Sequence, residues 1–242
     1  GLGDVYKRQN QINNSYVTML AKDYPINVFY GYVTDGIFQN QSEVNTHAVQ
    51  PGAEPGDIRF RDLNNDGVIN DSDRTVIGNP NPSWLFSMNN SLSYKGFELS
   101  VFLQGIAGNK IYNANNIDNT GMAAAYNQTT DVLKRWQGEG TSNSMPRAVF
   151  GDPNQNTRVS DRFVENGSYL RLKNVTLSYD LSDVFRKWSH LNDRNSRLSV
   201  YLSGENLATI TGYSGMDPEC GGWDALKYPV SRVLSVGVKL TY

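Results

Sequence analysis

Six residues between Asp62 and Asp73 have the types and spacing of a calcium-binding loop. The stretch reads DLNNDGVINDSD, with oxygen-bearing side chains at alternate positions and a glycine at the sixth position of a twelve-residue frame. Calcium takes oxygen ligands from such positions, and the glycine permits the sharp turn between them. The expected ligands, with Val68 contributing its main-chain carbonyl, are Asp62, Asn64, Asp66, Val68, Asn70 and Asp73. The spacing predicts a structural Ca²⁺ ion that stiffens this loop.

A metal-free interpretation of the same loop stays open. Asp73 is shorter than the glutamate that usually closes such a loop with two oxygens. Short Asp and Asn side chains also form Asx turns with their own backbone, and these would hold the loop without metal. The flanking segments GDIRFR and RTVIGNPNP are extended and turn-rich, so they exclude the paired helices of an EF-hand sensor.

Composition excludes several classes of protein. The 242 residues carry a formal net charge of −2, which offers no basic field for nucleic acid. A single cysteine, Cys220, excludes a disulfide framework and a four-cysteine zinc site. No carboxylate cluster outside the Asp62–Asp73 loop suggests catalysis, so we do not expect an enzyme. No segment approaches the ~18 consecutive apolar residues of a transmembrane helix, although alternating transmembrane strands remain possible.

Period-two alternation predicts about six strands. It is clearest in 84–94 and 97–104, which the turn Lys95-Gly96 joins into a hairpin, and it recurs in 197–205 and 235–242. In 169–181 the apolar phase changes, which predicts a bulge near Lys173-Asn174. A weaker pattern predicts an earlier strand at about Val28–Phe38.

Three features favour an outer-membrane barrel over a soluble sandwich. The connections alternate between long (39–83, 109–167, 208–229) and short (95–96, 181–196), as expected for long outer loops and short periplasmic turns. Aromatic residues gather at the predicted periplasmic strand ends, where an interfacial girdle belongs. The final residues SVGVKLTY fit the terminal signal of such barrels. In the outer loops Trp136, Trp223, Tyr213 and Tyr228 are candidates for stacking on sugar rings, with packing inside the loops as the alternative.

The opening residues GLGDVYKRQ resemble the conceptual translation of a sequencing adapter. We therefore interpret 1–9 as an artefact and 10–242 as protein, and we expect the natural N-terminus to be missing. On this interpretation the lack of a targeting signal carries no information on location.

Several long motifs resemble the C-terminal region of the SusC/RagA family of TonB-linked outer-membrane transporters. They are GDIRFRDLNNDGVINDSDRTVIGNPNP, NNSLSYKGFELSVFLQGIAGNKIYN, DRFVENGSYLRLKNVTLSYDL and LSVYLSGENLATITGYSGMDPE. The likeness runs in order from about Tyr24 to Tyr242. It implies an all-β fold: the last strands of a barrel of about 22 antiparallel strands with long outer loops. This part alone would form an open, curved sheet, because the plug and the remaining strands are missing.

The resemblance also implies a function, a location and partners. The family takes up glycans or peptides across the cell outer membrane, driven by the TonB complex, with a SusD-like surface lipoprotein that captures the cargo. Expected contacts are therefore outer-membrane lipid, oligosaccharide or peptide cargo, the lipoprotein and, through the missing N-terminal part, TonB. The alternative from the residues alone is a secreted, calcium-stabilised β-sandwich that serves binding or adhesion.

Overall fold

The chain divides into two compact units. A computed structural model describes residues 9–11, 17–189 and 197–241, without the side chains of 9–11, 188 and 189. The sheet unit consists of the described residues of 82–108, 168–217 and 228–242. The loop unit consists of the described residues of 1–81, 109–167 and 218–227. No helix among the described residues is long and apolar enough to cross a lipid bilayer.

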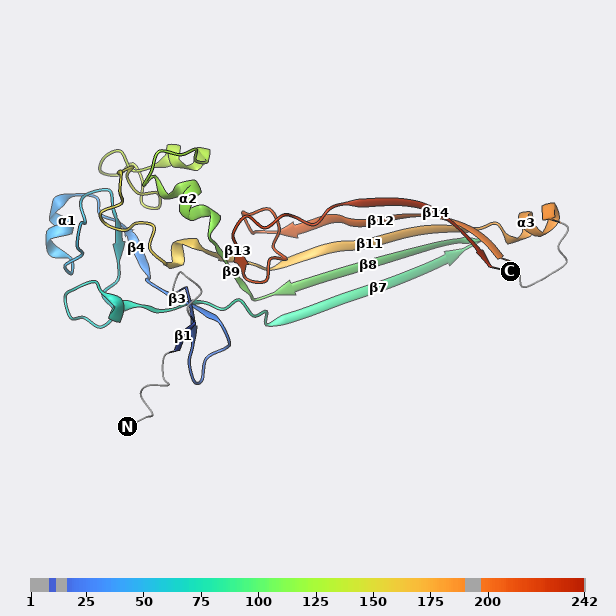
Figure 1. Ribbon diagram of the computed structural model, residues 1–242, viewed down its shortest axis with the longest axis horizontal. Coiled ribbons are helices and arrows are strands. Elements are labelled where there is room, and N and C mark those ends of the chain that lie inside the picture. Colours follow the sequence, from blue (N-terminus) through green and yellow to red (C-terminus); the bar gives the residue numbers. More distant parts are fainter. Residues whose placement is uncertain (1–8, 12–16, 190–196, 242) are drawn as a thin grey trace. The chain divides into compact units, whose positions relative to one another are not determined.

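Five antiparallel strands, the long arrows in Figure 1, form the sheet unit. Their spatial order is β14 (Val233–Thr241), β12 (Arg197–Thr211), β11 (Tyr169–Asp180), β8 (Phe97–Ala107) and β7 (Trp84–Tyr94). In the described part of the chain β14 and β7 each pair on one side only, so the predicted open antiparallel sheet is confirmed. Helix α3 (Ser182–Ser189) follows β11 in sequence.

The register gives the sheet one apolar and one polar face. Successive side chains of a strand point to opposite faces, and the register places apolar residues of one strand beside apolar residues of the next. One row across the sheet consists of Leu92, Leu99, Leu177, Leu202 and Val236. The adjacent row on the other face consists of Ser91, Ser100, Thr176, Ser203 and Ser235. The alternation in the sequence therefore corresponds to two chemically distinct faces.

The predicted turn and bulge are both confirmed. Lys95 and Gly96 join β7 to β8 with φ of 48° and 85°, the left-handed pair that a two-residue hairpin requires. In β11 the pairing with both neighbours shifts between Leu172 and Asn174. Lys173 is the extra residue relative to β8, whereas on the other side β12 has two residues, Asn206 and Leu207, opposite Lys173. Because of this bulge, the apolar residues before and after it lie on the same face.

The sixth expected strand, Val28–Phe38, is wrong as a single element of this sheet. It forms two short strands in the loop unit, β3 (Val28–Gly31) and β4 (Thr34–Ile37), which belong to different small sheets. The chain leaves the β3 ladder at Tyr32, whose main-chain N–H donates to the Val159 carbonyl at 2.9 Å. All four residues of β3 are buried, whereas a strand in the wall of a membrane barrel turns alternate side chains outward to lipid.

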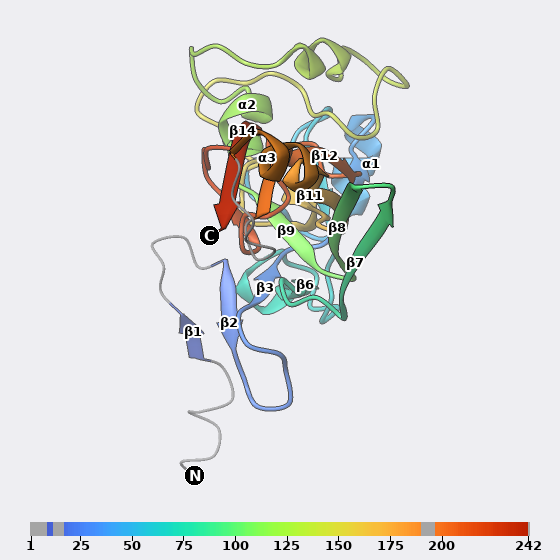
Figure 2. The same cartoon turned by 90° about the vertical axis from the view of Figure 1, so that its right-hand side faces the viewer.

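Within its described residues the loop unit contains three small sheets and two short α-helices, and Figure 2 labels both helices and several of the strands. The remaining strands are β1 (Gln9–Gln11), β2 (Thr18–Leu20), β5 (Ile58–Phe60), β6 (Thr75–Gly78), β9 (Lys110–Asn113), β10 (Val164–Asn166) and β13 (Trp223–Asp224). The sheets run β1-β2-β3-β6, β10-β9-β13 and β4-β5. The helices are α1 (Gln41–Thr46) and α2 (Asn115–Gly121), with 3-10 turns at Asp71–Asp73, Thr130–Lys134 and Asp161–Phe163.

Three small apolar clusters form the core of the loop unit. One contains Val17, Phe29, Tyr112 and Phe163, and another Met19, Val28 and Tyr30. The third, Ile58, Phe60 and Ile69, lies directly under the aspartate-rich loop. The segment interpreted as an artefact, 1–9, lies outside the described residues apart from Gln9, and so does the terminal aromatic residue Tyr242.

Candidate functional site

The aspartate-rich turn, residues Asp62–Asp73, connects β5 to β6 in the loop unit. Its Ile69 side chain is buried against Ile58 and Phe60, which fixes the middle of the turn on the core. Backbone hydrogen bonds join it to Val49, whose N–H donates to the Gly67 carbonyl at 2.8 Å and whose carbonyl accepts from Ile69 N–H at 2.9 Å. The six predicted ligand residues therefore lie in one anchored loop.

Gly67 allows the chain to reverse inside the turn. Its φ is 81°, in the left-handed region that favours glycine. Its N–H donates to Asp62 Oδ2 at 2.8 Å, so the first predicted ligand residue accepts a bond from the sixth position. The other oxygen, Asp62 Oδ1, is buried and has no hydrogen-bond partner within the described structure.

Three Asx turns organise the exposed side of the loop. Asn64 Oδ1 accepts from Asp66 N–H at 3.0 Å, Asp66 Oδ1 from Val68 N–H at 2.9 Å, and Asn70 Oδ1 from Ser72 N–H at 2.8 Å. The bonds from the Asn64 amide and from Val68 N–H hold the pKa of Asp66 below its usual value. These Asx turns are the hydrogen bonds that the metal-free interpretation of the loop requires.

Asp73, the expected closing ligand, has a capping role. Its Oδ1 accepts from Leu63 N–H at 2.9 Å and its Oδ2 from Asn70 N–H at 2.8 Å. The side chain is fully buried and forms a capping box with Asn70 at the start of the 3-10 turn. Asp73 ties the two ends of the loop together through backbone groups.

The chemistry of the donor set suits a hard cation, and three of its six residues, Asp62, Asp66 and Asp73, are carboxylates. Calcium takes carboxylate, amide and carbonyl oxygens, and all six residues offer one of these. Asp62 Oδ1 is the buried oxygen that a cation would satisfy. Over the described part of the chain, however, no group of three or more His, Cys, Asp or Glu side chains lies close enough to hold a metal ion. Besides carboxylates, a cation here would therefore need the Asn64 amide and the Val68 carbonyl as ligands, with Asn70 acting through water.

A second polar region, which the sequence did not indicate, holds the loop unit together around Asp57. This carboxylate is fully buried and accepts two bonds from Arg147, from Nε and Nη2, each at 3.0 Å. The paired bonds with Asp57 raise the pKa of Arg147. Arg147 Nη1 also donates to Glu54 at 2.6 Å. The arginine therefore joins two chain segments about ninety positions apart.

Buried amides extend this region as a relay. Gln50 Nε2 donates to Asn154 Oδ1 at 2.6 Å, Asn154 Nδ2 to Asn156 Oδ1 at 2.8 Å, and Asn156 Nδ2 to Asp57 Oδ1 at 3.0 Å. Buried amide groups need such partners, since an unmade hydrogen bond in the interior is costly. Every residue of the relay is polar and lacks periodic spacing, so no pattern in the sequence identifies it.

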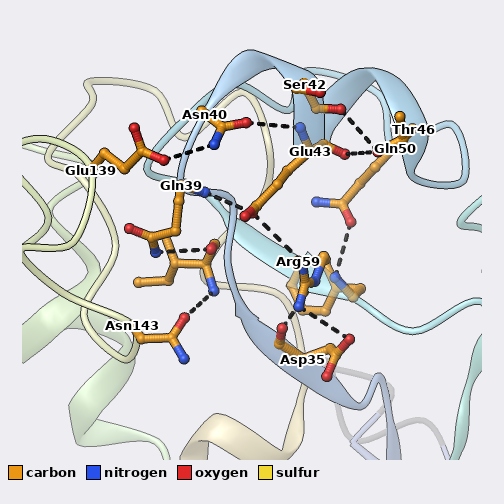
Figure 3. A network of polar contacts seen from close by, with 12 residues as sticks. Asp35, Gln39, Asn40, Ser42, Glu43, Thr46, Gln50, Arg59, Glu139 and Asn143 are labelled. Carbon is orange, nitrogen blue, oxygen red and sulfur yellow. Dashed lines mark hydrogen bonds and ion pairs between the residues drawn. The ribbon is translucent and has the colours of Figure 1, made fainter.

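Figure 3 shows a third, more exposed network around the start of α1. Arg59 lies between Asp35 and Glu43, with nitrogen–oxygen distances of 3.3 and 3.6 Å. Asn40 accepts from Glu43 N–H at 3.0 Å and donates to Glu139 at 2.8 Å. This network joins the first long connection of the chain to the second.

Packing accounts for three of the four aromatic residues considered for stacking on sugars. Trp136 packs on Gly56, where an added Cβ would lie 2.4 Å from the ring. Trp223 stacks on Tyr112 with ring centroids 5.1 Å apart, and Tyr213 is buried. Tyr228 is 87% exposed and offers a free ring face.

Comparison with known proteins gives a consistent assignment. The chain is 32% identical to the TonB-dependent receptor P3 of Formosa agariphila, over 99% of this chain and 24% of the receptor. It is 26% identical to the TonB-dependent receptor SusC of Bacteroides thetaiotaomicron, over 95% of this chain and 21% of SusC. No family model matches the chain. The chain thus spans about a quarter of the length of these relatives.

A solved structure has the same fold. A chain of the RagAB peptide transporter superposes with a TM-score of 0.75 at 24% identity, over 97% of this chain and 24% of that one. The fold and the relatives together define the class: the TonB-dependent receptors. The chain belongs to these receptors, SusC is among its relatives, and its location is the cell outer membrane.

Proposed function

We propose that the chain is part of a nutrient importer that works with the TonB complex. The observation that carries this proposal is the sheet unit: an open antiparallel sheet whose apolar side chains remain exposed on one face, Val236 at 83%. Such a face suits lipid, because outer-membrane strands turn apolar side chains outward. The similarity to TonB-dependent receptors along nearly the whole chain supports the same function. Those relatives are named as receptors, and none of these names is that of an enzyme.

The proposal includes a SusD-like surface lipoprotein as partner and an oligosaccharide or a peptide as cargo. Similarity to SusC supports the lipoprotein, and the RagAB peptide transporter supports a peptide as one option. The loop unit would form part of the surface that meets cargo and partner. The alternative of a secreted β-sandwich finds less support, since the five long strands form one sheet and not two packed sheets.

The test uses the complete receptor that carries this chain, expressed in its host with an affinity tag. We expect the receptor in the outer-membrane fraction, copurification of a lipoprotein, and uptake of labelled oligosaccharides or peptides that stops when the proton gradient is collapsed. A matched strain lacking the gene should lose that uptake. Recovery of the protein from the culture medium, or uptake unaffected by gene loss, would refute the importer and favour the secreted module.

We also propose a structural Ca²⁺ ion in the aspartate-rich turn. The buried, unpartnered Asp62 Oδ1 supports it, together with a set of oxygen donors of the kind calcium prefers. Asp62, Asn64, Asp66 and the Val68 carbonyl would hold the ion, with Asn70 acting through water and Asp73 closing the loop. The ion would supply positive charge that stiffens the turn.

Hydrogen exchange of the detergent-purified receptor tests the ion. Calcium added after chelation should slow exchange in residues 62–73 of the wild type but not of Asp62→Asn. Asp71→Asn is the matched control, since it removes the same charge from the turn outside the predicted ligand set. Equal exchange with calcium and with chelator would mean that the Asx turns alone hold the loop. That result would leave the importer proposal untouched.

A further inference from the structure

Arg158 occupies a position between two aromatic rings of the loop unit. Its guanidinium carbon lies 4.9 Å from the ring centroid of Tyr32 and 4.5 Å from that of Phe60. The side chain is held in place by its own segment, since Nη2 donates to the Asn154 carbonyl at 2.7 Å and Nε to the Gln155 carbonyl at 3.2 Å. A planar cation that contacts two rings is stabilised by the negative faces of both.

Both rings are attached to the aspartate-rich turn. The Tyr32 hydroxyl donates to Asp71 Oδ1 at 3.1 Å, at the 3-10 end of the turn. Phe60 belongs to the same apolar cluster as Ile69, the buried residue in the middle of the turn. Arg158 therefore contacts, through two different rings, two separate parts of residues 62–73.

The two segments that meet at Arg158 both contain strained backbone. Asn65 in the turn has φ of 58°, and Asp152 and Gln155 have φ of 47° and 56°. Non-glycine residues in the left-handed region cost free energy and persist only where their surroundings hold them. In the second segment Asp152 supplies that support, because its carboxylate accepts from Asn156 N–H at 2.6 Å and from Thr157 N–H at 2.9 Å.

We propose that Tyr32, Phe60 and Arg158 form a clasp through which the aspartate-rich turn and residues 152–158 gain or lose order together. A ligand or partner that contacts one segment would then change the order of the other, since such coupling is reciprocal. Arg158 acts here as a positioning residue. The clasp does not depend on a cation in the turn or on import.

Hydrogen exchange tests the clasp in the complete receptor, purified in detergent with a chelator so that calcium plays no part. Arg158→Lys keeps the charge and loses the planar group that contacts both rings. It should speed exchange roughly tenfold in 62–73 as well as in 152–158, within the range expected for a partly buried cation that contacts aromatic rings. Tyr32→Phe keeps the ring and removes the bond to Asp71, so it should speed exchange in 62–73 and, to a smaller extent, in 152–158.

Arg59→Lys is the matched control. It changes another arginine of the loop unit, which is bound to Asp35 and Glu43 and has no contact with the turn or with 152–158 among its described bonds. It should speed exchange near 35–43 and leave 62–73 and 152–158 unchanged. The proposal fails if Arg158→Lys affects only 152–158, or if Arg59→Lys affects 62–73 as strongly. If Arg158→Lys does not yield folded receptor, the contrast between Tyr32→Phe and Arg59→Lys decides in the same way.

Discussion

The sheet unit and the loop unit are stabilised in opposite ways. Of the buried hydrophobic side chains in the described part of the chain, all but Tyr169 and Tyr213 belong to the loop unit. The sheet unit leaves most of its apolar side chains exposed on one face and aligns hydroxyl groups on the other. The loop unit buries small apolar clusters and surrounds them with paired carboxylates, guanidinium groups and amides.

This contrast predicts that one kind of substitution destabilises the sheet unit and another kind destabilises the loop unit. The sheet depends on which face a side chain points to, because its apolar face suits lipid and not a protein core. The loop unit depends on complete pairing of buried polar groups, because each unpaired group carries a large desolvation cost. Mutations can therefore separate the two modes of stabilisation.

Arg147→Ala should have the largest effect, and it should be confined to the loop unit. The substitution leaves the fully buried Asp57 without its cation, which typically costs about 3–5 kcal/mol. We expect rapid proteolysis of the loop unit in the detergent-purified receptor while the sheet unit stays resistant. Lys134→Ala is the control, since its pair with Asp131 is exposed and should contribute about 0–1 kcal/mol. Equal sensitivity of the two variants would contradict the buried role of Arg147.

Val236→Lys should have the second largest destabilising effect, and this effect should be in the sheet unit. Val236 lies mid-strand on the apolar face, where a lysine facing lipid costs about 2–4 kcal/mol. Ser235→Lys introduces the same residue one position earlier on the polar face, so it should be tolerated. The measurement is the amount of folded receptor in isolated outer membranes. A tolerated Val236→Lys, or equal loss in both variants, would mean that the apolar face does not meet lipid.

The sequence predicted the sheet unit well because the relevant information is local. Alternation in 84–94 and 97–104, with Lys95-Gly96 between them, determines the faces, the hairpin and its register. The phase change near Lys173 likewise placed the bulge. The expected strand at Val28–Phe38 was wrong because alternation does not distinguish one strand in a barrel wall from two short strands in different small sheets, of which β3 is buried throughout and β4 only in part.

The loop unit and most of the candidate site could not be predicted in the same way. The aspartate-rich turn was visible because its ligand pattern lies within twelve consecutive residues. The capping role of Asp73 was not visible, since it depends on backbone N–H groups of Leu63 and Asn70. The bond between Gln50 and Asn154 joins residues 104 positions apart, and neither residue type signals a partner at that distance.

Gly237→Ala should destabilise the protein less than Arg147→Ala or Val236→Lys does, and its effect should again be in the sheet unit. An added Cβ would lie 2.4 Å from the ring of Tyr201, the residue paired with Gly237 across β12 and β14. Overpacking against this partly exposed ring should cost about 1 kcal/mol, the low end for overpacking, and we expect slower assembly of the heat-modifiable folded form on gels. Tyr201→Ser in the same chain should restore assembly, because it removes the clashing ring. Failure of that rescue would assign the requirement at position 237 to something other than the ring.

The smallest expected effect is an acid sensitivity of the aspartate-rich turn. Asn64 and Val68 hold the pKa of Asp66 below its usual value of 3.8, so the folded turn favours the ionised carboxylate. A depressed pKa contributes stability that is present above the unfolded value and is lost as pH falls through the folded one. Exchange in residues 62–73, corrected for the intrinsic rate, should therefore rise as the pH drops from about 5 to about 3. Asp66→Asn should flatten this dependence, because an amide does not titrate, while the Asp57–Arg147 region should respond equally in both proteins. A dependence that survives in Asp66→Asn would assign the acid sensitivity to another carboxylate of the turn.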